Sequence, residues 1–529
     1  MKIDNIDFKK HFLSVHAQCK ILNMKEVSNN SRITKNTILL YLRMLILLGV
    51  SLYTSRVILA TLGVEDYGLY NVVGGIVSMF SFVNMAMGNA SSRFITYALG
   101  KGDKDELKTV FNTTVLVHLG IAILIVIIAE TIGLWLLDNK MVIPHDRIRA
   151  AHWVYQFSIV SCVASMMCVP FNATIIAHEK MGAFAYLSII DAILKLLIVY
   201  LLQTLPFDNL IVYGFLYMLV TVFDVSLYEI YCIKHFSEVE FSIPHDKKLL
   251  KGITTFAGWS MIGNLACVGY NQGINILLNI FFGPAVNAAR GVAYQVQGAV
   301  KSFITNFQTA ANPQITKSYA THDYYRLHTL LFAVSRFSFY LLLCIALPVS
   351  VCADTILSIW LVDVPDHTRN FLILILLVSL IDTLERPINT AMNATGEIKK
   401  YQIISCSIQV LVIPISYLFL VFGSIPEVIF VVYFVIMGIA YISELIILHK
   451  KINLDIGVYI RKVIYRVFPV FIVSVTLAIM IDHYINNATV LGAFLTTVTI
   501  VICVFISVWS IGIEKEEKKM LLKKLFKVK

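Results

Sequence analysis

Charged residues are scarce in this chain: they make up 14% of its 529 residues, whereas hydrophobic residues make up 58%. A typical soluble domain carries about 25% charged residues. The mean hydropathy of +0.77 is correspondingly high. The composition excludes a soluble globular protein and is typical of a polytopic membrane protein.

Several kinds of motif are also missing. The nine cysteines form no CxxC pair, which argues against a disulfide framework and against a zinc site. There is no glycine-rich phosphate-binding loop, so direct use of ATP is not expected. The alternating pattern of an outer-membrane barrel is missing, and no cleavable signal peptide is expected. We therefore expect no cofactor and no bound metal.

What the chain does contain is long apolar runs. About fourteen segments, most of them about twenty residues or longer, can cross a hydrocarbon core of roughly 30 Å as helices. The expected fold class is an all-α polytopic membrane protein. Spans are predicted near 37–62, 68–98, 107–137, 148–177, 182–203, 208–233, 252–282, 285–318, 327–361, 368–394, 400–422, 426–449, 463–485 and 489–512.

The basic residues predict the orientation of these spans. The short connections on one side of the membrane hold 16 lysines and arginines, and those on the other side hold 4. Because basic residues concentrate on the cytoplasmic side, both termini are predicted to be cytoplasmic. The same distribution accounts for the net charge of +10 without a nucleic-acid partner. The connections are too short for a folded catalytic domain outside the membrane.

The two halves of the chain resemble each other. Shifting residues 63–109 by 220 positions gives eight identities, Asp103 with Asp323 among them, and Pro170-x-Asn172 resembles Pro387-x-Asn389. Parallel repeats of this kind are typical of transporters, with the binding site between the repeats. The predicted divisions are a cytoplasmic extension (1–35), an N-lobe (36–235), a C-lobe (250–450), two further spans (457–512) and a basic cytoplasmic tail (513–529).

One predicted span carries a polar face. Polar residues recur in it every three or four positions, which places them on one side of a helix. They are Arg290, Tyr294, Gln297, Lys301, Thr305, Gln308 and Asn312. Charged and amide groups are costly in hydrocarbon, so this face should point toward protein or a wet cavity. We predict that it lines the path of a polar, anionic substrate.

The first span carries a motif of its own. The chain reads Tyr53-x-x-Arg56, then Leu62-Gly63, then Tyr67-Gly68-Leu69-Tyr70. This run resembles the N-terminal signature of bacterial polysaccharide-transport proteins, the O-antigen and capsule repeat-unit flippases. Their superfamily also contains the multidrug and toxin extruders. The resemblance implies a V-shaped bundle of two six-helix lobes plus two C-terminal helices, which alternates between inward-open and outward-open forms.

The same resemblance implies that spans one, two, seven and eight line a cationic cavity. In this chain their basic residues, apart from Lys317 at the cytoplasmic edge, are Arg43, Arg56, Arg93, Arg290 and Lys301, and they contain no acidic residue. Arg and Lys bind a pyrophosphate through charge-assisted hydrogen bonds. Arg93 is expected to reach the lipid headgroups instead. The predicted substrate-binding residues are Lys301, Arg290, Arg56, Arg43, Gln297, Asn271, Asn275, Tyr294, Gln308 and Asn312, with Asn264 as a further amide; Lys301, near mid-membrane, is the strongest candidate.

Other charges lie inside predicted spans. Asp191 and Lys195 are one helical turn apart, as are Asp382 and Arg386, and this spacing favours local ion pairs. A proton- or sodium-coupled cycle needs a titratable acid near the pathway. The candidates for ion coupling are Asp382, Glu385, Asp224 and Glu229.

The sequence thus predicts a transporter rather than an enzyme: a flippase for undecaprenyl-pyrophosphate-linked oligosaccharide in the bacterial inner membrane, driven by an ion gradient or the membrane potential. The expected partners are this substrate, membrane lipids, H⁺ or Na⁺ and polysaccharide assembly proteins. The alternatives are a multidrug antiporter, a lipid II flippase and a membrane glycosyltransferase or polymerase. The enzymes usually carry a large external loop or an acidic catalytic pair, which this chain lacks.

Overall fold

The computed structural model describes residues 36–529 apart from several short gaps. The gaps are 52, 55–56, 59–60, 63–65, 67–68, 71–72, 75–76, 78–79, 141–142, 203, 205, 243–245, 361–363, 486–488, 515–516 and 519–529. Most of the described residues are helical, and none of them forms a strand. The all-α prediction is confirmed. The predicted extension at 1–35, Arg56, Tyr67 and Gly68 lie outside the described residues.

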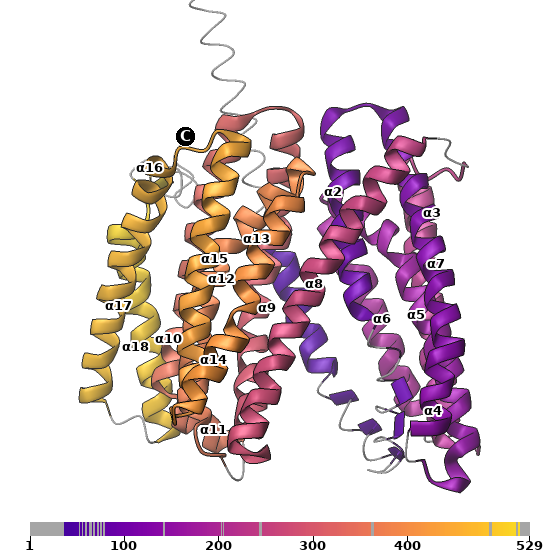
Figure 1. The fold of residues 1–529 in the computed structure, drawn as a ribbon, viewed down its shortest axis with the longest axis horizontal. Helices are drawn as coiled ribbons and strands as arrows, with labels where there is room; N and C mark the ends of the chain where they lie inside the picture. The colour runs from indigo at the N-terminus through magenta and orange to yellow at the C-terminus, as the bar shows by residue number, and fades with distance from the viewer. Residues whose placement is uncertain are drawn as a thin grey trace, which may run out of the picture.

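The N-terminal half is a bundle of helices (Figure 1). A helix at Asn36–Ser51 opens it. The helices that follow are α2 (Ser81–Lys101), α3 (Lys104–Ile128), η1 (Ala129–Gly133), α4 (Leu134–Lys140), η2 (His145–Arg147), α5 (Ile148–Ala177), α6 (Met181–Leu202) and α7 (Asn209–His235).

The C-terminal half forms a second bundle beside the first (Figure 1). Its helices are α8 (Lys247–Phe282), α9 (Pro284–Ala320), α10 (Tyr324–Val351), α11 (Ala353–Trp360), α12 (Thr368–Thr395), α13 (Lys399–Val410), α14 (Val412–Val421), α15 (Val428–Ile452), α16 (Ile456–Tyr459), η3 (Ile460–Ile464), α17 (Tyr465–Tyr484), α18 (Val490–Ser507) and η4 (Val508–Gly512). The last two long helices, α17 and α18, lie at its outer edge.

Ten helical segments among the described residues are long and apolar enough to cross a membrane. They match ten of the predicted spans, so the prediction of a multi-pass membrane protein is confirmed. The other four predicted spans correspond to the helix that begins at Asn36, to α2, to α9 and to α12. Polar residues interrupt the apolar sequence of α9 and α12, and these residues form the site described below.

Helix α8 connects the two bundles. It crosses diagonally between them (Figure 1). Near its start, Ile253, Phe256 and Ala257 are buried in a core with Val83 and Met87 of α2. Near its end, Tyr270, Ile274 and Leu278 belong to the large core of the C-terminal bundle. One long helix therefore belongs to both hydrophobic cores.

Two residues of the proposed internal repeat have the same role. Asp103 caps the N-terminus of α3, where its side chain accepts hydrogen bonds from the backbone N–H groups of Asp105 and Glu106. Asp323 caps α10 and accepts from the N–H of Arg326. Carboxylates are favoured at this position because they satisfy helical N–H groups that have no partner within the helix. The aligned aspartates thus start equivalent helices in the two halves.

Candidate functional site: a polar cavity between α9 and α12

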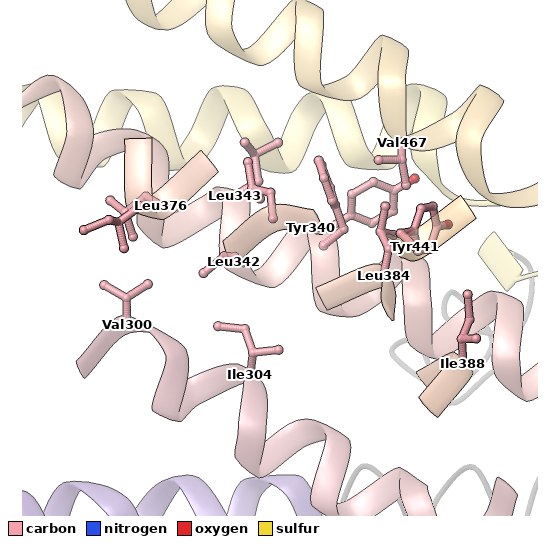
Figure 2. Packing of buried hydrophobic residues seen from close by; sticks show 14 of the residues in the cluster. Val300, Ile304, Tyr340, Leu342, Leu343, Leu376, Leu384, Ile388, Tyr441 and Val467 are labelled. Atoms are coloured by element: carbon pink, nitrogen blue, oxygen red, sulfur yellow. The ribbon is translucent and has the colours of Figure 1, made fainter. Parts of the chain in front are cut away.

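The polar and apolar residues of α9 lie on separate faces. Val300 and Ile304 pack toward Leu342 of α10 and Leu376 of α12 (Figure 2). This apolar face anchors α9 in the core of the C-terminal bundle. The polar face is thereby held toward a cavity of about 590 Å³.

Six of the seven residues of the predicted polar face line this cavity: Tyr294, Gln297, Lys301, Thr305, Gln308 and Asn312. Arg290 is not among its lining residues. Helices α2, α8, α12, α13 and α15 complete the wall. A cavity of this size is in the range that binds small molecules or the head of a larger one.

Lys301 belongs to a charge cluster that is centred on Asp382. Its Nζ is 2.6 Å from Oδ2 of Asp382, and the same oxygen is 3.1 Å from Nε of Arg386. The predicted pair of Asp382 and Arg386 is therefore present, but it is not self-contained, because a second helix adds Lys301. Asp382, Glu385 and Arg386 all line the cavity. The described cavity thus holds acids as well as bases, and its acids lie on α12, outside the four spans that the sequence resemblance assigns to the cavity.

Polar contacts run along the whole interface between α9 and α12. Gln297 Nε2 donates to Ser379 Oγ at 2.8 Å. Deeper in the bundle, Gln308 Nε2 donates to the carbonyl of Thr383 at 3.4 Å and to Ser338 Oγ of α10 at 3.1 Å. These bonds satisfy amides that would otherwise be costly in a membrane span. They also hold both helices in one register.

Asn312 and the amides of α8 complete the polar wall. Thr390 Oγ1 donates to Asn312 Oδ1 at 3.2 Å. Asn271 and Asn264 of α8 both line the cavity. The hydroxyl of Tyr294 donates to Asn271 Oδ1 at 3.3 Å. Amide and hydroxyl groups of this kind can hydrogen-bond a sugar or any other polar ligand.

Several predicted residues lie elsewhere. Arg290 donates from Nη2 to the Asn271 carbonyl at 3.0 Å, and its guanidinium lies 4.3 Å from the ring centre of Tyr294. The guanidinium of Arg43 lies 4.4 Å from the ring centre of Phe184 on α6. Neither arginine lines the described cavity, and nor do Asn275, Asp224 and Glu229.

Sequence reasoning named Asp382 and Glu385 of α12 as candidates for ion coupling but missed the polar face that this helix contributes to the wall. Its polar residues Ser379, Asp382, Arg386, Asn389 and Asn393 line the cavity and recur every three or four positions. That is the same periodic signal that marked α9. Applied to α12, it would have found the second polar face. Among the described residues, no group of three or more His, Cys, Asp or Glu side chains is placed to hold a metal ion.

The two bundles meet at one end of the molecule. Glu179, between α5 and α6, accepts hydrogen bonds at Oε1 from Gln314 Nε2 at 2.6 Å and from Lys317 Nζ at 2.8 Å. Nearby, Arg93 of α2 donates to the carbonyl of Asn393 on α12 at 3.3 Å. The contacts of Gln314 and Lys317 lie beyond the cavity-lining part of α9, and together with that of Arg93 they join the two bundles at this end.

Known protein families match the chain over most of its length. The family model described as "Polysaccharide biosynthesis protein" matches residues 33–319. The chain belongs to this family. The MatE family model matches residues 260–418, and the two matches together place the chain in the superfamily of multidrug and polysaccharide exporters. The predicted recognition is confirmed, and this member of the polysaccharide biosynthesis family is a multi-pass membrane transporter.

Solved structures of the same superfamily share the fold. One is an outward-facing multidrug resistance MATE family transporter of the MOP superfamily (14% identity, TM-score 0.67, covering 80% of this chain and 96% of that one). A second is a MOP superfamily transporter from Pyrococcus furiosus whose binding pocket is described as having reverse polarity (14% identity, TM-score 0.66, covering 80% of this chain and 96% of that one). A third is a MATE protein in a bent conformation (14% identity, TM-score 0.70, covering 80% of this chain and 96% of that one). Among curated protein sequences, none matches.

Proposed function

We propose that this transporter is a flippase that moves an undecaprenyl-pyrophosphate-linked oligosaccharide across the bacterial inner membrane by alternating access. The observation that carries the proposal is the position of Lys301, which faces a cavity within the membrane-spanning bundle together with Arg386. Two cations in a partly dehydrated space are suited to a pyrophosphate. The family match supports a substrate of polysaccharide biosynthesis.

Binding would exchange one anion for another. In the structure the carboxylate of Asp382 contacts both Lys301 and Arg386. A pyrophosphate that enters the cavity takes the place of this carboxylate and bonds to both cations. The amides of Asn271, Gln297 and Asn312 then remain for the sugar hydroxyls, although each must exchange its present partner. Asp382 thus offsets one of the two positive charges while no substrate is bound, because an unpaired charge inside the membrane is costly.

The contacts between the bundles fit the outward-open half of such a cycle. The basic connections after α2, α9 and α12 mark the cytoplasmic side under the positive-inside rule. The contacts of Glu179 and Arg93 lie at this end and close it. Rearrangement of these contacts would open the cavity to the cytoplasm. The membrane potential favours outward movement of an anion by about 2.3 kcal/mol per charge per 100 mV.

A second candidate function is export of a cationic drug. The observation that favours it is the presence of Asp382 and Glu385 in the cavity wall, since carboxylates bind cations. The fold of the solved multidrug transporters is compatible with either substrate. The two functions predict opposite roles for Lys301, which binds the substrate of a flippase and opposes binding in a cation exporter.

The test replaces Lys301 in the native host. We expect Lys301→Ala to reduce surface polysaccharide at least about tenfold, because the substrate loses one charged hydrogen-bond partner. Lipid-linked repeat units should accumulate on the cytoplasmic side. Lys195→Ala is the matched control, because Lys195 is also a membrane-embedded lysine paired with an aspartate but does not line this cavity. Normal surface polysaccharide in Lys301→Ala at normal protein level would contradict the flippase. A gain in drug resistance in that variant would favour the cation exporter.

A further inference from the structure

Two neighbouring carboxyl groups lie at the cavity wall, one in the wall and one behind it. Glu385 is on α12, and its side chain reaches the cavity. Glu444 is on α15 and has no exposed surface, while Glu385 is 7% exposed. The two helices pack against each other, and the carboxyl groups are close enough for a hydrogen bond between them. Two like charges at this separation, both removed from water, would repel strongly.

The hydrogen bonds around the pair are incomplete if both groups are ionised. Glu444 Oε1 accepts from Ser405 Oγ at 2.5 Å. The Oε2 atoms of Glu385 and Glu444 are buried and have no hydrogen-bond donor in the described part of the chain. The hydroxyl of Tyr401, itself 99% buried, faces Glu444 but makes no well-formed hydrogen bond there. Buried polar atoms without partners are rare, and each calls for an explanation.

A single shared proton accounts for both the charge repulsion and the missing hydrogen bonds. A proton on either carboxyl makes that group a donor to the other, so both unpartnered oxygens are satisfied. It also removes one of the two negative charges. We propose that Glu385 and Glu444 share a proton and form an exchangeable proton-binding site, with Glu385 as the connection to the cavity. The site itself does not depend on which substrate is carried; its use in coupling rests on the proposed transport function.

The charged neighbours favour a proton over a metal cation at this site. Lys301 of α9, together with Asp382 and Arg386 of α12, acts on Glu385 electrostatically. With one shared proton the pair carries a single negative charge, and Asp382 carries another. These charges balance Lys301 and Arg386, so the whole cluster is neutral. A sodium ion would have to bind beside two cations.

The remaining groups that face the pair are neutral. From α13 they are Tyr401, Ser405 and Cys406: Ser405 donates to Glu444, and Tyr401 and Cys406 both feel the charge of Glu444. From α15 the neighbour is Tyr441, whose hydroxyl is 2.9 Å from that of Tyr459. None of these groups supplies a charge that would hold both carboxylates ionised. Because Glu444 has no exposed surface while Glu385 reaches the cavity, a proton exchanges with the cavity through Glu385.

The experiment is pH-difference infrared spectroscopy on the purified protein in liposomes, without substrate. We expect a band of one protonated, strongly hydrogen-bonded carboxylic acid that disappears on raising the pH. The same single band should be lost in Glu385→Gln and in Glu444→Gln. Glu397→Gln should retain it, because Glu397 is an exposed carboxylate that is paired with Lys451. Replacing Na⁺ by choline should leave the band unchanged.

Other outcomes overturn the proposal. One is a band that is still present in both glutamine variants. A second is a pair of separate bands, of which each glutamine variant loses a different one. A third is a band that appears only when Na⁺ is removed. If Glu444→Gln does not fold, Ser405→Ala serves in its place. It removes the hydroxyl that donates to Glu444, so it should shift the band, and an unshifted band counts against the shared site. Because no substrate is present, this result is independent of the transport result for Lys301→Ala.

Discussion

The two bundles each hold charges inside the membrane, and they arrange them differently. In the N-terminal bundle, Lys195 Nζ is 2.8 Å from Asp191 Oδ2 one turn away on α6. The ammonium also lies 5.4 Å from the ring centre of Tyr217. In the C-terminal bundle, Asp382 pairs with Arg386 one turn away on α12, but Lys301 of α9 joins the same oxygen.

The difference separates a local pair from a cluster that spans helices. A pair within one helix neutralises its own charges and leaves the neighbouring helices free. A carboxylate shared between two helices links their positions. Its contacts change when either helix moves or when a ligand competes for the cations. Only the second arrangement lines the described cavity. The lesson is that equal spacing in sequence does not imply equal function.

The largest expected effect comes from removing the shared carboxylate. Asp382→Ala leaves Lys301 and Arg386 without their common partner, and we expect a loss of roughly 3 kcal/mol in unfolding free energy, as for a broken buried ion pair. Asp191→Ala breaks a single local pair and should cost about 1 kcal/mol or less. Thermal unfolding of the detergent-solubilised protein measures both. The double variant Lys301→Ala with Asp382→Ala should recover part of the loss. Equal losses of unfolding free energy in Asp382→Ala and Asp191→Ala would contradict the distinction between the bundles.

A second prediction concerns the place where the bundles touch. A Cβ atom at Gly100 of α2 would lie 2.8 Å from the Cβ of Ala320 and 3.2 Å from the Cα of Lys317. Gly100→Val should therefore push α2 and α9 apart and weaken closure at this end. Gly120→Val is the control, because a Cβ there meets no atom within 4 Å. Thiol labelling of Cys267, an exposed cysteine in the cavity wall, is the readout. We expect about tenfold faster labelling from the cytoplasmic side, equal to a shift of about 1.4 kcal/mol; an unchanged rate would show that this contact does not control access.

The smallest expected effect is a pH-dependent change in stability. It arises from one buried carboxylate in a connection of each bundle. Burial raises the pKa of Glu238, but three effects together outweigh it: the hydrogen bond with His178, 2.5 Å from Nε2 to Oε1, a backbone hydrogen bond and the charge of His178. The pKa of Glu238 therefore lies below its ordinary value. Burial likewise raises the pKa of Glu427, but bonds from Asn370 and His367 lower it further than burial raises it. A lowered pKa stabilises the fold above the ordinary value of about 4.3, and this contribution is lost as the pH falls through that region.

The unfolding temperature measured between about pH 7 and pH 3 tests this comparison. Glu427→Gln should remove more of the acid sensitivity than Glu238→Gln, because two side chains donate to Glu427. Each contribution should be on the order of 1 kcal/mol. An acid-induced loss that is the same in wild type and in both variants would place the responsible groups elsewhere.

The sequence predicted most of the helices. Apolar runs long enough to span a bilayer have few alternatives to a helix, because the backbone must satisfy its own hydrogen bonds there. The polar face of α9 could be predicted for a similar reason, since helical periodicity is a local property. Even the pairs Asp191–Lys195 and Asp382–Arg386 follow from spacing alone.

What the sequence alone determined, then, is which segments are helices and which face of α9 is polar. Only the tertiary structure decided what that face meets. Lys301 and Asp382 are far apart in the chain, and their contact depends on how α9 packs against α12. The same is true of Glu385 and Glu444, which come from different helices. Helical periodicity acts over a few residues, whereas the charge of a cavity is set by groups that packing brings together.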